Sequence, residues 1–183
     1  RANFFKIFAD GVVEGNPFVS PPTLGNAAML ESYLQPRFAV DAGGHATVTG
    51  YVDTGSQLCQ DVRAHPDQYR STEAVSAFSA AHGFHPGQCQ ISTGKLQDDR
   101  AVLLELARRM HLAGFNLHIH VIGDRATRTA VDAIEAARAA DGNSSTHDSL
   151  AHLQFVHPDD VARLGRDHLY VVYTFSWASV DLD

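Results

Sequence analysis

FNLHIHVIGDRATRTAVDAIEAAR, residues 115–138, carries the pattern that decides the fold. In its first part, Leu, Ile and Val residues alternate with His118 and His120, which is the period of a half-buried β-strand. After Gly123 turns the chain, apolar residues recur at the spacing of one face of an α-helix. The stretch therefore predicts a strand that leads directly into an amphipathic helix.

The same alternation continues on both sides of this stretch. A helix is expected over residues 98–114, where acidic residues come first, basic residues come late and Gly114 follows the end. Downstream, a strand is expected over residues 149–156, a helix over 157–168 and a final strand over 169–175. Strands that alternate with helices indicate an α/β fold with a parallel sheet.

The first half of the chain is less regular. FFKIFADG, residues 4–11, predicts a buried strand that ends in an Asp-Gly turn. Residues 15–95 are rich in Gly, Pro, Asn, Ser and Thr, so we expect a loop-rich insertion there. Within it we expect two short strands around Gly43–Gly44 and a helix over residues 71–83.

Length and composition favour one globular domain. The chain has 183 residues, of which 44% are hydrophobic and 19% charged, which is enough for one sizeable core. We expect a single domain over residues 1–183, with the insertion at 15–95 and regular strand–helix repeats at 96–183. Both end segments read as strands, so the chain is expected to be a piece of a larger domain.

Charge and cysteine content limit the partners and the compartment. The net charge is -7 and the basic residues form no runs, which argues against nucleic acid and anionic membranes as partners. No apolar run approaches the length that spans a bilayer. Cys59 and Cys89 make no metal-binding pair by spacing, and they form either one disulfide or two free thiols. We favour two thiols and a cytoplasmic location.

Three residues at expected strand ends have the chemistry of metal ligands. In an α/β barrel the active site forms at the C-terminal ends of the parallel strands, and Lys6, His120 and His152 fall near such ends. Imidazole is the commonest ligand for zinc and similar metals. A lysine ammonium repels a cation, but carbamylation by carbon dioxide converts it into an oxygen-donor anion.

Each candidate also has a structural interpretation. A single histidine on a strand is more often a core or edge residue than a ligand, but His118 shares a face with His120, and a His-x-His pair favours a metal. Asp124 is expected to cap the following helix, with orientation of a ligand imidazole as a second role. The remaining histidines are expected at the surface: His45, His65, His82, His85, His111, His147, His157 and His168.

Four segments together resemble one known family. They are KIFADGVVEG (residues 6–15), HIHVIGDRATRTAVDAIEAAR (118–138), SLAHLQFVHPDDVARL (149–164) and VVYTFSWA (171–178). In this order they are similar to the strand-four, strand-five, strand-six and strand-seven segments of the amidohydrolase superfamily, in the branch called amidohydrolase family 3. The resemblance implies a partial (β/α)8 TIM-type barrel that covers roughly strands 4 to 7, with a loop-rich insertion.

The resemblance also implies a metal-dependent hydrolase. By position, Lys6 would be a carbamylated bridging ligand, and His120 and His152 would be the ligands from strands five and six. One or two divalent ions, usually zinc, would activate water and polarise the carbonyl of a small-molecule amide-type substrate. Further candidates for orienting a ligand or binding substrate are Asp10, His118 and Asp124. His118 is not counted as a ligand, because its position varies in the family.

The chain departs from the family's pattern in three places. The strand-one His-x-His pair and the strand-eight Asp have no counterpart here, and Ala151 stands where many relatives have Glu. We therefore expect a fragment that lacks part of the metal site and can be inactive by itself. Its exposed strand edges favour self-association or a homo-oligomer. Two alternatives stay open. One is a non-catalytic α/β binding or assembly domain, and the other is a different metal hydrolase that uses His118 and His120 as a pair.

Overall fold

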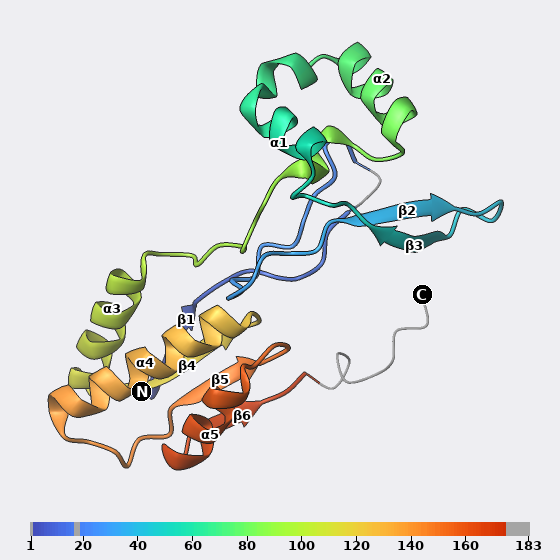
Figure 1. Ribbon diagram of the computed structural model, residues 1–183. Helices are drawn as coiled ribbons and strands as arrows, with labels where there is room; N and C mark the ends of the chain where they lie inside the picture. The colour runs from blue at the N-terminus through green and yellow to red at the C-terminus, as the bar shows by residue number, and fades with distance from the viewer. Residues whose placement is uncertain (1, 17–18, 175–183) are drawn as a thin grey trace. The chain divides into compact units, whose positions relative to one another are not determined.

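The chain forms two compact units, which Figure 1 traces from the N-terminus to the C-terminus. The computed structural model describes residues 2–16 and 19–174. Unit 1 comprises residues 1–13, 25–31 and 93–183, and unit 2 comprises residues 14–24 and 32–92. The chain therefore returns to unit 1 at residues 25–31, within the stretch that its composition marks as an insertion.

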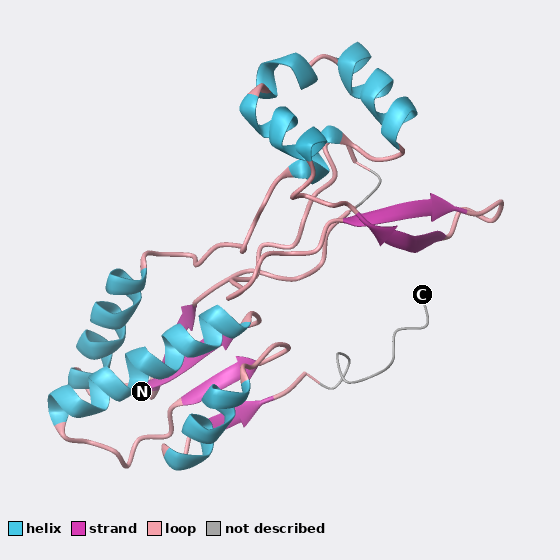
Figure 2. Ribbon diagram, in the orientation of Figure 1, coloured by secondary structure: helices cyan, strands magenta, loops and turns pink. Residues whose placement is uncertain are grey.

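Unit 1 is built on a parallel sheet of four strands (Figure 2). The strands lie side by side in the order β1 Phe4–Phe8, β4 Asn116–Val121, β5 Ser149–His152 and β6 Tyr170–Val172. The mixed α/β class and the parallel sheet are confirmed. β5 is shorter than predicted, and the end of the predicted last strand, residue 175, lies outside the described residues.

A helix precedes each later strand of unit 1. These helices are α3 Arg100–Leu112, α4 Asp124–Asp141 and α5 Pro158–Arg166. The bounds of α3 and α5 lie within two residues of the predicted ones, and α4 follows Gly123 as predicted. Leu117, Ile119 and Val121 of β4 are buried in one core with Val131 and Ile134 of α4. The strand period therefore buries the apolar face of β4, as its sequence predicts.

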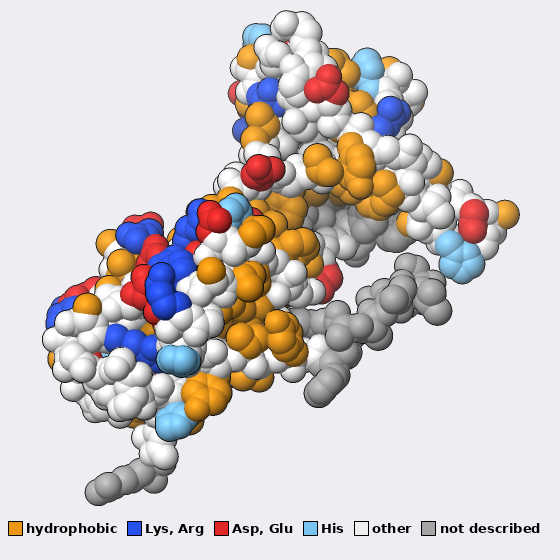
Figure 3. All heavy atoms as spheres, turned by 60° about the horizontal axis from the view of Figure 1, so that its bottom comes forward, with side chains coloured by type: hydrophobic (Ala, Val, Ile, Leu, Met, Phe, Trp, Pro, Cys, Tyr) orange, Lys and Arg blue, Asp and Glu red, His pale blue; other side chains and the backbone are white. Residues whose placement is uncertain are grey.

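Ion pairs tie the helices of unit 1 together outside this core. In Figure 3, positive and negative side chains lie interleaved over the helical part of the unit. Arg163 of α5 lies 2.6 Å from the carboxylates of both Asp132 and Glu135 of α4. Arg138 of α4 donates to Asp148, whose carboxylate is fully buried just before β5, at 2.9 Å. Removal of one partner of the Arg138–Asp148 pair is expected to be strongly destabilising, because the other partner would be left as an uncompensated buried charge.

One histidine expected at the surface is buried in unit 1. His111 of α3 is 2% exposed, and its Nδ1 lies 2.6 Å from a carboxylate oxygen of Asp141. The prediction was wrong because His111 continues the inward stripe of α3, four residues after Ala107 and eight after Leu103. A polar side chain on such a stripe needs a partner, and Asp141 provides it.

Unit 2 contains a hairpin and several short helices. It comprises β2 Pro36–Val40, β3 Ala46–Tyr51, α1 Gln57–Ala64, the 3-10 helix η1 Pro66–Tyr69, α2 Thr72–His82 and the 3-10 helix η2 Pro86–Cys89. The predicted hairpin is confirmed, with Gly44 in its turn at φ 86°. α2 is confirmed too: the Ser71 side chain caps its start, and Gly83 ends it at φ 73°. α1 was not predicted.

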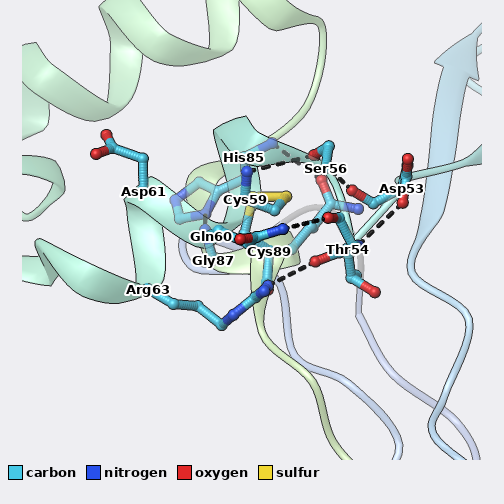
Figure 4. Close-up of a disulfide and its surroundings, with 12 residues drawn as sticks. Asp53, Thr54, Ser56, Cys59, Gln60, Asp61, Arg63, His85, Gly87 and Cys89 are labelled. Atoms are coloured by element: carbon cyan, nitrogen blue, oxygen red, sulfur yellow. Dashed lines mark hydrogen bonds between the residues drawn. A yellow bond between two sulfur atoms is a disulfide. The ribbon is translucent and has the colours of Figure 1, made fainter.

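A disulfide joins α1 to η2 in unit 2 (Figure 4). Cys59 and Cys89 are both fully buried, and their Sγ atoms lie 2.03 Å apart. The prediction of two free thiols was therefore wrong. The two cysteines are 30 residues apart in sequence, so only the packing of α1 on η2 brings them together. Arg63 of α1 reinforces this junction by donating to the backbone carbonyls of Thr54 and Cys89.

Candidate metal centre

The polar candidates of unit 1 share one face of its sheet. In the register of the strands, Lys6 lies opposite His118, and His118 lies opposite Ser149. Two residues further along, Phe8 lies opposite His120. Because side chains alternate across a strand, Lys6, His118 and His120 project from the face opposite to the apolar core. The parallel order thus brings residues that are more than a hundred positions apart onto one surface.

His120 and His152 are in direct contact at the end of this face. Their ring centroids lie 4.8 Å apart in a T-shaped arrangement. In the register His152 lies opposite Val121, which is on the core-facing row, but its backbone has φ 84° at the end of β5. This left-handed conformation is rare for a residue with a side chain and clusters at functional sites. At His152 this backbone conformation accompanies the turn of the imidazole toward His120. A residue with extended strand backbone at this position would point toward the core instead.

The imidazole of His120 is held by its Nε2 atom. Nε2 lies 3.0 Å from the backbone oxygen of Gly11 and 3.6 Å from Oδ1 of Asp10. A carbonyl oxygen only accepts, so Nε2 carries the proton and donates it, which leaves the lone pair on Nδ1. Metal-ligating histidines are held in this way, with the nitrogen that does not bind the metal donating to a carbonyl or a carboxylate. His120 is therefore oriented to offer Nδ1.

Asp10 is a buried carboxylate that accepts hydrogen bonds from the surrounding backbone. It is 1% exposed and accepts hydrogen bonds from the N–H groups of Ala28 (2.9 Å), Ile122 (3.0 Å) and Gly123 (2.8 Å). Burial raises the pKa of Asp10, and these three hydrogen bonds act against that rise. With its oxygens engaged by the backbone, Asp10 is placed to orient its neighbours and has little exposure to bulk solvent.

Asp124 has a different role from the expected helix cap. The N-cap of α4 is Gly123, and no side chain caps the helix there, so the capping prediction was wrong. Asp124 is instead the first residue of α4, and its Oδ1 accepts from the N–H of Leu30 at 2.8 Å. The carboxylate points to a neighbouring segment because the helix starts one residue earlier than expected.

Lys6 lies one same-face step before the two-histidine contact, since it pairs with His118 while Phe8 pairs with His120. Its Nζ is 5.0 Å from the centroid of the Phe8 ring, and that ring lies 5.4 Å from the ring of His120. Partial burial lowers the pKa of Lys6, which favours the neutral amine, the form that reacts with carbon dioxide. Lys6 also lines an open hollow of about 740 Å³ with His118, whose Nδ1 lies 2.7 Å from Oγ of Ser149.

The donor set fits a divalent metal only with a contribution from lysine. Among residues 2–16 and 19–174, no three His, Cys, Asp or Glu side chains come together as a metal site. His120 and His152 supply two nitrogens in contact, and Lys6 would supply an oxygen once carbamylated. Two imidazoles and a carboxylate-like oxygen suit zinc and related ions. The ligand set Lys6, His120 and His152 stays a prediction, with its strands adjacent as it requires.

A second hollow, in unit 2, contains a serine–histidine contact in which the histidine does not activate the serine as a nucleophile. The hollow measures about 500 Å³, and in it Nε2 of His85 lies 3.3 Å from Oγ of Ser20. Nδ1 of His85 accepts from the N–H of Gly87 at 2.9 Å. Burial lowers the pKa of His85, so the neutral ring is favoured, with its proton on Nε2. A ring that donates to Ser20 does not accept the hydroxyl proton, as activation of a serine requires.

Comparison with known proteins agrees with the sequence resemblance. The family model described as "Amidohydrolase family" matches residues 69–168. A metal-dependent hydrolase from Pyrococcus furiosus matches at 23% identity and a TM-score of 0.37, over 48% of this chain and 16% of its own. A metal-dependent hydrolase from Pyrococcus horikoshii matches at 22% identity and a TM-score of 0.36, over 44% and 15%. This chain thus spans about a sixth of these structures, and no curated protein matches it.

Proposed function

Since the chain belongs to the amidohydrolase family, we propose that it supplies part of the active site of a metal-dependent hydrolase. The proposed reaction is hydrolysis of an amide-type carbon–nitrogen bond in a small molecule. The observation that carries this proposal is the pair His120 and His152, whose rings touch while Nε2 of His120 is fixed by Gly11. Such a pair has the form of two oriented ligands rather than two independent core histidines.

In the proposed site, three residues would hold one or two divalent ions. Nδ1 of His120 and a ring nitrogen of His152 would be nitrogen donors, and Lys6 would bridge as a carbamate. The bound ion, zinc in our proposal, supplies Lewis acidity toward a carbonyl and lowers the pKa of bound water. The protein's own part is to fix the imidazoles, through Gly11 and the φ 84° backbone of His152, and to present His118 and Ser149 along the adjoining face.

We also propose that the sheet of unit 1 is an arc of a (β/α)8 barrel, equivalent to strands 4 to 7. The support is its topology, because β1, β4, β5 and β6 are parallel, follow chain order and alternate with α3, α4 and α5. The candidate ligands lie on the face of the sheet that is opposite to the helix-covered core, which in a barrel is the interior. The family match covers α3 through α5 and supports this assignment.

Metal content of the intact protein tests the proposed function. We expect purified protein to carry a divalent ion, and His120→Ala to lose most of it, because a ligand is removed. His118→Ala should keep the ion, whereas a site built on the His118–His120 pair would lose it. His45→Ala, an exposed histidine on the hairpin of unit 2, is the matched control. Intact protein that binds no divalent ion would instead favour the non-catalytic domain.

The compartment and the partners are also proposals. No helix in the described part of the chain is long and apolar enough to cross a membrane. Disulfides persist mainly in oxidising compartments, so Cys59–Cys89 weighs against the predicted cytoplasmic location. We propose a small-molecule substrate and self-association through the sheet edges β1 and β6. Size-exclusion chromatography with and without reductant measures the association.

A further inference from the structure

A short segment of unit 1, residues 25–31, is fastened by two carboxylates from other elements. We call this segment the strap. Oδ2 of Asp10 accepts from the N–H of Ala28 at 2.9 Å, and Oδ1 of Asp124 accepts from the N–H of Leu30 at 2.8 Å. Asp10 follows β1 and Asp124 opens α4, so the strap is bound at the ends of two different strand–helix units. Charged acceptors make the stronger class of hydrogen bond, and both are engaged here by backbone donors.

Arg125, the next residue after Asp124, fastens the strap from the other side. Its Nε donates to the backbone oxygen of Met29 at 3.0 Å. Its Nη2 donates to the backbone oxygens of Thr93 and Gly94 at 2.9 and 3.1 Å. One guanidinium therefore satisfies three carbonyls that belong to two separate passages of the chain through unit 1.

Glycines allow the backbone to approach this closely. A Cβ on Gly123 would lie 2.0 Å from the backbone oxygen of Ala28, and a Cβ on Gly94 would lie 1.8 Å from that of Ala27. Contacts at these distances cannot be relieved by a side-chain movement, because the opposing atoms are backbone. The Gly-Asp-Arg run at 123–125 is thus a seat for the strap: the glycine clears the space, the aspartate accepts and the arginine donates.

Asp10 is the point where the strap meets the candidate ligand. Its Oδ2 accepts from Ala28 of the strap and from Gly123 of the seat. Its Oδ1 accepts from Ile122 and lies 3.6 Å from Nε2 of His120. The backbone donors on Oδ2 fix the rotation of the carboxylate. That rotation in turn decides how close Oδ1 stands to the imidazole.

We propose that Asp10 is a positioning residue that, together with the carbonyl of Gly11, favours the Nε2–H tautomer of His120, and that hydrogen bonds from Ala28 and Gly123 hold its carboxylate in the orientation this requires. The proposal rests on the proposed function, because its consequence is that the Nδ1 lone pair of His120 is available to bind a metal. A negative charge beside Nε2 stabilises the proton there and makes Nδ1 the better donor. Asp124 holds the strap at Leu30, and Arg125 joins the strap to Thr93 and Gly94, whereas Asp10 meets both the strap and His120.

Nitrogen-15 NMR of the metal-free intact protein tests the tautomer directly. We expect the wild-type ring of His120 to show the shifts of the Nε2–H form. Asp10→Asn should raise the fraction of the Nδ1–H tautomer, because the amide lacks the charge beside Nε2 and cannot accept from every backbone donor that the carboxylate serves, while the Gly11 carbonyl still favours the Nε2–H form. Asp124→Asn, which weakens the strap contact at Leu30 and does not touch His120, is the matched control and should keep the Nε2–H form. An Nδ1–H ring in the wild type overturns the proposal without any variant.

Zinc affinity separates this inference from the proposed function. In competition titrations we expect Asp10→Asn to bind zinc about 10–100-fold more weakly than wild type, the usual loss when the group that orients a ligand is removed. Asp124→Asn should stay close to wild type. Wild-type protein that binds no zinc defeats the proposed function and leaves the tautomer result to decide the role of Asp10. Wild-type protein and Asp10→Asn that bind zinc equally well defeat the inference alone.

Discussion

The two units are held together by different means. Unit 1 buries an apolar core between a parallel sheet and three helices, and it also buries the Arg138–Asp148 ion pair. Unit 2 has a much smaller core around Val62 and Phe78, which the Cys59–Cys89 disulfide closes. The difference shows that a stretch with little apolar surface to bury reaches a defined structure through a covalent link, as small domains generally do.

Breaking the buried ion pair should give the largest effect, and it should fall on unit 1. Arg138→Leu leaves the fully buried carboxylate of Asp148 without its cation, and we expect a loss of roughly 3–5 kcal/mol in the free energy of unfolding. Arg100→Leu removes an ion pair with Asp132 in which the arginine side chain is 57% exposed, and it should cost less than about 1 kcal/mol. Urea unfolding measures both. Equal losses would remove the distinction between buried and exposed pairs.

Removing the disulfide should give the next largest effect, confined to unit 2. Cys59→Ser combined with Cys89→Ser should cost about 2–4 kcal/mol, because the 30-residue loop between them gains freedom when the chain unfolds. Hydrogen exchange should show faster exchange of the amides of α1 and η2, with β4 and α4 unchanged. Loss of protection in β4 would show that the disulfide also supports unit 1, contrary to the comparison.

Two glycines should respond in opposite directions, one in each unit. Gly165 lies inside α5, and a Cβ there would meet nothing within 4 Å, so Gly165→Ala should stabilise unit 1 by about 0.5–1 kcal/mol. Gly83 ends α2 at φ 73°, so Gly83→Ala should destabilise unit 2 by about 1 kcal/mol. Thermal unfolding measures each change in stability, and hydrogen exchange assigns it to one unit. Stabilisation by both alanines would mean that φ 73° carries no strain.

Acid should give the smallest effect. Burial acts to raise the pKa of Asp132, but hydrogen bonds from Arg100 and Arg163 outweigh it, and the pKa is lowered. A carboxylate with a lowered pKa stabilises the folded state above its unfolded value of about 4, and this contribution is lost as the pH falls through the folded pKa. Unfolding of unit 1 between pH 5 and pH 2 should therefore become easier, and Asp132→Asn should flatten that dependence. An unchanged slope in the variant would rule out this carboxylate as a contributor.

Local patterns predicted most of unit 1. The alternation in β4 and the helical spacing in α4 are properties of neighbouring residues, so the sequence shows them directly. In unit 2 the same reasoning found the hairpin and α2, whose turn and cap residues are local. It missed the disulfide, which depends on contacts between residues far apart in the chain.

The candidate site was predictable in its residue types but not in its geometry. Strand alternation predicts His118 and His120 on one face, and the register of β1 and β4 agrees with it. The φ 84° backbone of His152 has no signal in its sequence, since a histidine at a strand end is ordinarily extended. Asp10 reads as part of an Asp-Gly turn, and its hydrogen bonds to residues 28, 122 and 123 arise only from the packing of distant segments.

The strap has a consequence for the modularity of the chain. The backbone oxygen of Val12 accepts from the N–H groups of Asn26 and Ala27, and the N–H of Met29 donates to the backbone oxygen of Thr93, all three at 2.8 Å. Each excursion into unit 2 therefore leaves and re-enters unit 1 at neighbouring points. A protein engineer could shorten either excursion with a brief linker, or graft a foreign segment in its place, without moving the anchors. Replacement of the whole of residues 14–24 or 32–92 should therefore be better tolerated by unit 1 than a change at its anchors, because both gaps are already closed by the scaffold that remains.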